Sequence, residues 1–112
     1  MPEQGPGVSY DTVAREWRCK WSDAQGRASV GHVQAAWEAV AESVRATPGV
    51  VRVQRMCCGT CMDYKIIVSM SAGHYATWAA RQHAPENEFL AALRSVDGVT
   101  QVEAQLYSIM DA

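Results

Sequence analysis

The alternation of apolar and polar residues near the start of the chain predicts a β-strand. Between positions 16 and 22 every second residue is apolar, so one side of the strand carries Trp17, Cys19 and Trp21 and the other carries Arg18 and Lys20. Successive side chains of a strand point to opposite faces of the sheet. We therefore expect a half-buried strand with its aromatic side against a core.

The next segment has the period of an amphipathic helix. Asp23 to Gly26 is a turn, and the apolar residues Val33, Trp37, Val40 and Val44 then recur at intervals of four, three and four. Ser29 is a candidate for the helix cap. The helix ends at Thr47-Pro48-Gly49, because proline cannot continue it and glycine tolerates the backbone conformations needed to leave it.

Two runs rich in β-forming residues, 50–58 and 61–69, predict a hairpin around Gly59-Thr60. A two-residue turn there places Cys58 opposite Cys61 and Val53 opposite Ile66. In this register Cys57 enters the core on the helix side, while Cys58 and Cys61 stand together on the other face.

The second half of the chain repeats this order. Ser71 and Pro85 each begin a helical segment, which predicts a crossover helix broken near Pro85, and 99–110 reads as a last strand. Thr-Pro-Gly-Val-Val-Arg-Val (47–53) and Val-Asp-Gly-Val-Thr-Gln-Val (96–102) both mark a change from helix to strand. The fold class is therefore α+β, a ferredoxin-like βαββαβ sandwich with helices on one face of a four-stranded antiparallel sheet.

Length and charge restrict the domain count and the partners. With 112 residues we expect one domain over 13–112, preceded by a flexible tail over 1–12 that is rich in proline and glycine. The formal net charge of −2 gives no general attraction for nucleic acid. No secretory signal or membrane span is recognised, so we expect a cytoplasmic protein with reduced cysteines.

The predicted strands divide their side chains between two faces. Val51, Val53, Val102 and Leu106 should point to the helices. The opposite face should carry the candidate ligand-binding residues, which are Arg18, Lys20, Arg52, Lys65, Glu103 and Tyr107. A plain solvated face is one interpretation. The alternative is a homodimer whose facing sheets enclose a polar cavity for a small anionic ligand.

The stretch from Pro48 to Met110, with P-G-V-V-R-V-Q-R, C-G-T-C-M-D-Y-K-I-I-V and D-G-V-T-Q-V-E-A-Q-L-Y, resembles the ligand-binding domain of leucine-responsive and asparagine-operon regulators. More broadly it resembles the dimeric α/β-barrel superfamily, which includes small monooxygenases, isomerases and cyclases. The resemblance implies a dimer with facing sheets. The residues before Arg15 are too few for the helix-turn-helix of those regulators, so we expect no contact with DNA.

Three functions follow as hypotheses. The first is a non-catalytic, small-ligand-binding or regulatory homodimer. The second is an isomerase, cyclase or oxygenase that works without a cofactor, with Tyr64, His74 and Asp63 as the acid/base set; no nucleotide-binding fingerprint suggests a cofactor. The third is a thiol redox or zinc protein that uses Cys58 and Cys61.

Overall fold

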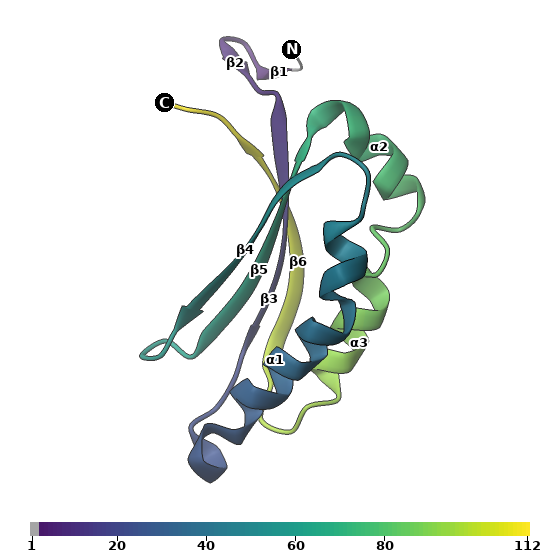
Figure 1. The fold of residues 1–112 in the computed structure, drawn as a ribbon. Coiled ribbons are helices and arrows are strands. Elements are labelled where there is room, and N and C mark those ends of the chain that lie inside the picture. The colour runs from purple at the N-terminus through teal and green to yellow at the C-terminus, as the bar shows by residue number, and fades with distance from the viewer. Residues whose placement is uncertain (1–2) are drawn as a thin grey trace.

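A computed structural model describes residues 3–112 of the chain. Its main body follows the predicted order of strands and helices (Figure 1), with bounds β3 Thr12–Lys20, α1 Ala24–Arg45, β4 Val50–Cys58, β5 Asp63–Ser71, α2 Ala72–Ala80, α3 Glu86–Arg94 and β6 Thr100–Ile109. The sheet is antiparallel, in the order β4-β5-β3-β6, and all three helices lie on one of its faces. The ferredoxin-like fold and the broken crossover helix are thereby confirmed.

The chain begins with a short hairpin that the sequence pattern does not predict. Strands β1 (Glu3–Gly5) and β2 (Val8–Ser9) pair with each other, and Figure 1 shows them projecting beyond the end of the sheet. The Ser108 hydroxyl donates to the Gln4 side chain and so ties the hairpin to β6. Residues 1 and 2 of the predicted flexible segment lie outside the described residues.

Aromatic side chains fill the space between the sheet and the helices. Trp17, Trp37 and Phe89 are at most 4% exposed. The Phe89 ring centroid lies 5.6 Å from that of Trp17 and 5.9 Å from that of Trp37, as is usual for aromatic pairs in a core. The apolar stripe of α1 is buried as predicted, and burial of these large side chains stabilises the fold.

The start of α1 differs from the prediction at Ser29. Gln25, Gly26 and Arg27 have left-handed backbone angles, so regular helix begins only after them. The Ser29 hydroxyl accepts a hydrogen bond from the Ser22 amide at 2.9 Å instead of capping an amide of its own helix. Ser29 therefore fastens the helix to the end of β3.

The β4–β5 hairpin is shifted by two residues from the predicted register. Cys58 pairs with Asp63 and Cys57 with Tyr64, so the turn is 59–62 and Cys58 does not stand opposite Cys61. The prediction of a two-residue turn at Gly59-Thr60 was therefore wrong. From Arg52 to Cys58 this shift of two keeps each side chain on its predicted face, because side-chain direction alternates with a period of two.

Two apolar residues that were predicted to face the helices, Val51 and Leu106, are more exposed than predicted. A bulge in β4 between Val50 and Arg52 turns Val50 toward the core and leaves Val51 68% exposed. Leu106, on the edge strand β6, is 44% exposed. Val53 and Val102 do pack against the core as predicted.

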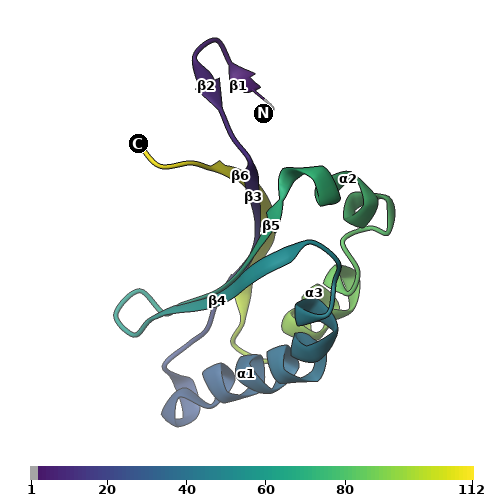
Figure 2. The ribbon, with the colours of Figure 1, turned by 45° about the horizontal axis from the view of Figure 1, so that its top comes forward.

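The tip of the β4–β5 hairpin also departs from the prediction. Cys57 shares a face with the buried Tyr64, yet it is exposed. Figure 2 shows the reason, since the hairpin extends past the layer of helices. The predicted burial of Cys57 was wrong because no helix covers the tip.

Candidate active site

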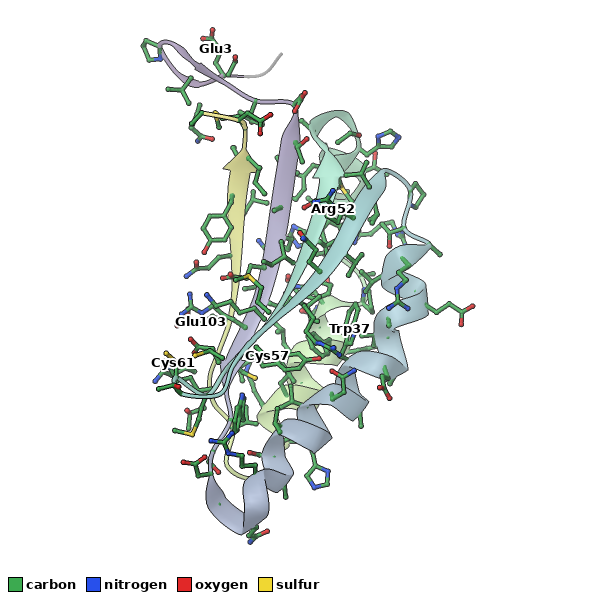
Figure 3. The ribbon with its side chains drawn as sticks, turned by 60° about the vertical axis from the view of Figure 1, so that its left-hand side comes forward. Glu3, Trp37, Arg52, Cys57, Cys61 and Glu103 are labelled. Atoms are coloured by element: carbon green, nitrogen blue, oxygen red, sulfur yellow. The ribbon has the colours of Figure 1, made fainter. Side chains whose placement is uncertain are left out.

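The predicted ligand-binding residues gather on the open sheet face, with one exception. Arg18 stands between Glu103 on β6 and Lys65 on β5. The Tyr107 hydroxyl donates to the Glu16 carboxylate at 3.2 Å. Arg52 lies apart from this group, opposite Ser69 on β5, and Figure 3 shows it well separated from Glu103.

Carboxylates balance the positive charges of this face. Lys20 lies 2.8 Å from Asp63, a contact that lowers the pKa of the Asp63 carboxyl group. Glu16, only 5% exposed, has carboxylate oxygens 3.7 Å from the Arg18 guanidinium and 3.8 Å from the Lys65 ammonium. Three of the cations predicted to hold an anion, Arg18, Lys20 and Lys65, therefore already have carboxylate partners. An anionic ligand would have to compete with these carboxylates.

The predicted acid/base residues do not converge. Tyr64, at the start of β5, is buried on the helix side and its hydroxyl donates to Gln34 at 2.5 Å. The neighbouring Asp63 pairs with Lys20 on the opposite face. His74 follows the far end of β5, where its Nδ1 lies 2.7 Å from the Ser71 hydroxyl. Burial raises the pKa of Tyr64 far above its ordinary range, which makes it a poor base at neutral pH.

The proposed metal ligands Cys58 and Cys61 lie close together at the hairpin tip. The Cys61 amide donates to the Cys58 sulfur at 3.1 Å. Over residues 3–112, however, no three side chains of histidine, cysteine, aspartate or glutamate are grouped so as to hold a metal ion. Structural zinc takes four ligands, so one chain supplies an incomplete set.

A different polar cluster lies between the sheet and the helices, centred on Glu86. Its carboxylate accepts hydrogen bonds from Arg15 Nε at 2.8 Å, Arg15 Nη2 at 3.2 Å and Trp17 Nε1 at 2.7 Å. Burial acts to raise the pKa of Glu86, but the hydrogen bonds from Arg15 and Trp17 outweigh it and lower the pKa. Glu86 is therefore a fixed negative charge near the core.

His83 and Tyr75 extend this cluster toward solvent. His83 Nδ1 lies 3.6 Å from a Glu86 oxygen, and His83 Nε2 lies 2.7 Å from the Tyr75 hydroxyl. Burial, followed by the charge of Arg15, lowers the pKa of His83 more than Glu86 raises it, so the imidazole is neutral at pH 7. The carboxylate favours the tautomer with its proton on Nδ1, which leaves Nε2 to accept a hydrogen bond from the Tyr75 hydroxyl. Tyr75, His83 and Glu86, named here the Tyr75–His83–Glu86 series, can therefore move a proton.

Several elements hold the series in place. Alternation on β3 turns Arg15 and Trp17 toward the helices. The turn between α2 and α3 brings His83 back over α2, with Gln82 and His83 both at positive φ. Trp78 fixes this turn, because its indole donates to the Ala84 carbonyl at 2.9 Å and its ring meets the His83 ring edge to face at 5.1 Å.

Sequence reasoning missed this cluster because its members come from three elements. The spacing on α2 suggested His74 as the partner of Trp78, and the two do border a small cavity of about 60 Å³. His83 lies in the turn after α2 and Glu86 is the first residue of α3, and no local period could show that they point back to β3. The one signal in the sequence was the position of Glu86 directly after Pro85, since a carboxylate is favoured at a helix start.

Comparison with known proteins gives matches in structure only. No protein-family model and no curated protein sequence matches the chain. The chain is similar to SnoaB, a cofactor-independent oxygenase from Streptomyces nogalater, with 17% identity, TM-score 0.65 and coverage of 91% of this chain and 96% of SnoaB. It is also similar to the monooxygenase ActVA-Orf6 of Streptomyces coelicolor, solved with Nanaomycin D, with 19% identity, TM-score 0.63 and coverage of 92% and 90%. A third match is Rv0793 from Mycobacterium tuberculosis, with 13% identity, TM-score 0.63 and coverage of 90% and 97%.

At these identities the likeness shows the fold alone, the ferredoxin-like arrangement of strands and helices described above. The finer resemblance to leucine-responsive and asparagine-operon regulators finds no support in these matches. Within residues 3–112 there is also no helix with the length and apolar character needed to cross a membrane.

Proposed function

We propose that the protein is an oxygenase that needs no cofactor and uses the Tyr75–His83–Glu86 series as its acid/base group. The single observation that carries the proposal is the 2.7 Å contact between the Tyr75 hydroxyl and the neutral His83 ring, backed by the fixed charge of Glu86. The fold shared with a cofactor-independent oxygenase supports the hypothesis of an oxygenase over the hypothesis of a non-catalytic ligand-binding homodimer. Tyr64, His74 and Asp63 do not form such a group.

The chemistry requires a substrate that can lose a proton and then give electrons to dioxygen. An aromatic ketone with an activated methylene group is such a substrate, because its enolate is electron-rich. The Tyr75 hydroxyl gives its proton to His83 as it takes up the methylene proton, dioxygen adds to the carbon, and the proton returns to form a hydroperoxide. Loss of water then leaves a carbonyl, so CH₂ and O₂ give C=O and H₂O. Both side chains are half-buried, so each keeps part of its surface open to solvent.

The test uses anthrone as a probe and measures oxygen uptake with a metal chelator present and no added flavin or nicotinamide. We expect His83→Gln and Tyr75→Phe to lower the rate by about 100-fold, which is typical for loss of a general acid/base group. His32→Gln, a change at an exposed histidine of α1, is the matched control and should leave the rate unchanged.

Two results would reject the oxygenase. Equal rates in wild type and His83→Gln would remove the series from the reaction. Conversion of the probe without oxygen uptake would favour the isomerase or cyclase alternative.

The ligand-binding alternative rests on the open sheet face. We propose that two copies of the chain meet through this face, because Met56 is 55% and Tyr107 42% exposed there beside the buried Glu16. A polar cavity between the sheets, lined by Arg18 and Lys65, would then be available to a small ligand. Thermal stabilisation by small carboxylates that is lost in Lys65→Met would support this regulatory function. The cytoplasmic location stays a prediction.

A further inference from the structure

Two thiols meet at the tip of the β4–β5 hairpin, far from the Tyr75–His83–Glu86 series. Cys58 is half-buried and accepts the Cys61 amide hydrogen bond at 3.1 Å, while Cys61 is exposed at the tip (Figure 3). Both are free thiols. The Cys58 sulfur lies 3.1 Å from the backbone nitrogen of Cys61, which is only two bonds from the Cys61 Cβ. Rotation of the Cys61 side chain can therefore bring its sulfur to that of Cys58, as a disulfide requires.

Cations from two other elements hold the backbone of this turn. Lys20 of β3 donates to the Cys61 carbonyl at 2.9 Å and pairs with Asp63 at 2.8 Å. Arg27 of α1 donates to the Gly59 carbonyl at 3.4 Å. The turn is therefore fixed at its backbone while its sulfur atoms stay accessible.

The third cysteine of the hairpin is excluded from the pair by its direction. Cys57 pairs with Tyr64 on the helix side of the sheet and borders an open groove with Gln34 and Arg55. Adjacent residues of a strand point to opposite faces, so Cys57 points away from Cys58. Cys57 therefore serves as an internal control for any reaction of the other two.

We propose that Cys58 and Cys61 form a dithiol site that reacts reversibly with small-molecule disulfides and closes to an intramolecular disulfide. In the first step the Cys58 thiolate attacks one sulfur of the small disulfide and releases one thiolate of that molecule. In the second step Cys61, having lost its proton, attacks the Cys58 sulfur and releases the second thiolate. The two cysteines lose two electrons and two protons, and the small disulfide is reduced to two thiols.

Electrostatics favour these separate roles. Hydrogen bonds from the amide and the thiol of Cys61 lower the pKa of Cys58, and the same contact with Cys58 raises the pKa of Cys61. Cys58 is thus the better attacking group, and Cys61 is the residue that resolves the mixed disulfide. Buried Cys19, whose pKa burial raises to about 11, takes no part.

The experiment treats the full chain with oxidised glutathione and follows the mass of the tryptic peptide 56–65, which contains all three hairpin cysteines. Wild type should lose two hydrogens in this peptide and release two glutathione molecules per chain. Cys61→Ser should stop at the glutathione adduct. Cys58→Ser should form no internal disulfide and react at least about tenfold more slowly. Cys57→Ser is the matched control and should behave as wild type.

Three results would overturn the dithiol site. Internal disulfide formation in Cys58→Ser would assign the reaction to Cys57. Absence of reaction in wild type would show that the thiols are inert. Zinc that copurifies with the chain and protects both sulfurs would identify a metal site instead. Circular dichroism of each variant separates these results from unfolding.

Discussion

Glu86 accepts hydrogen bonds from two residues of β3 and joins the sheet to α3. We predict that Glu86→Ala lowers the free energy of unfolding by about 3 kcal/mol, because it leaves the Arg15 guanidinium and the Trp17 N–H unpaired in a mostly buried site. Glu88, exposed in the same helical turn, provides the control, and Glu88→Ala should change stability by less than about 0.5 kcal/mol. Urea titrations measure both; equal losses would contradict the role of Glu86.

Glu86 also makes the free energy of unfolding depend on pH. Because the pKa of Glu86 is lowered in the folded state, its ionised form stabilises the fold above the ordinary pKa of about 4.3. That contribution is lost as the pH falls toward the folded-state value. We predict that wild type is more stable than Glu86→Gln at pH 7 and that the difference shrinks below pH 4. A urea midpoint difference that is constant over this range would argue against an ionised Glu86.

At the scale of elements, the repeated Gly-Val phrase marks two places where a helix gives way to a strand. Gly49 and Gly98 both have φ of 88°, which other residues adopt at a cost. A Cβ on Gly49 would lie 2.3 Å from His74 Cβ, an atom fixed to α2, whereas a Cβ on Gly98 would meet the Ser22 hydroxyl, which can rotate. We predict that Gly49→Ala costs about 3 kcal/mol and Gly98→Ala about 1 kcal/mol.

The comparison for these two glycines is Gly31, which lies within α1 with free space around its Cα. Gly31→Ala should stabilise the protein by up to about 1 kcal/mol, because alanine is the better helix former. Thermal unfolding of the three variants ranks them by stability, and we expect Gly31→Ala to be the most stable and Gly49→Ala the least. If Gly98→Ala were the most damaging, the fixed contact with His74 would not be the controlling one.

At the scale of the whole molecule, the open sheet face is the surface that a second copy would cover. We predict that the protein is a dimer by light scattering and that Ile67→Asp shifts it to monomer, since Ile67 lies at mid-strand beside Glu16. Glu88→Lys, at an exposed position of α3 on the opposite side of the sheet, should leave the mass unchanged. A monomer at all concentrations would reject the dimer.

The sequence by itself determined the order of elements from β3 to β6, the sheet face of most strand residues and most of the core. These depend on periods of two and of three to four residues, which are local properties, and on turns that proline and glycine impose. Trp17, Trp21 and Trp37 are buried as their spacing predicts. From Arg52 to Cys58 the faces are as predicted in spite of the two-residue error in the hairpin register, because an even shift does not reverse them.

Only the tertiary structure decided which polar groups meet. Arg15, His83 and Glu86 are separated by up to 71 positions, and their contact depends on how α2 and α3 turn back over β3. The same holds for Tyr64 and His74, which share β5 and its continuation yet lie at opposite ends of the strand. Periodicity reports the direction of a side chain but not its partner across the core, because that partner is chosen by packing between elements distant in the chain.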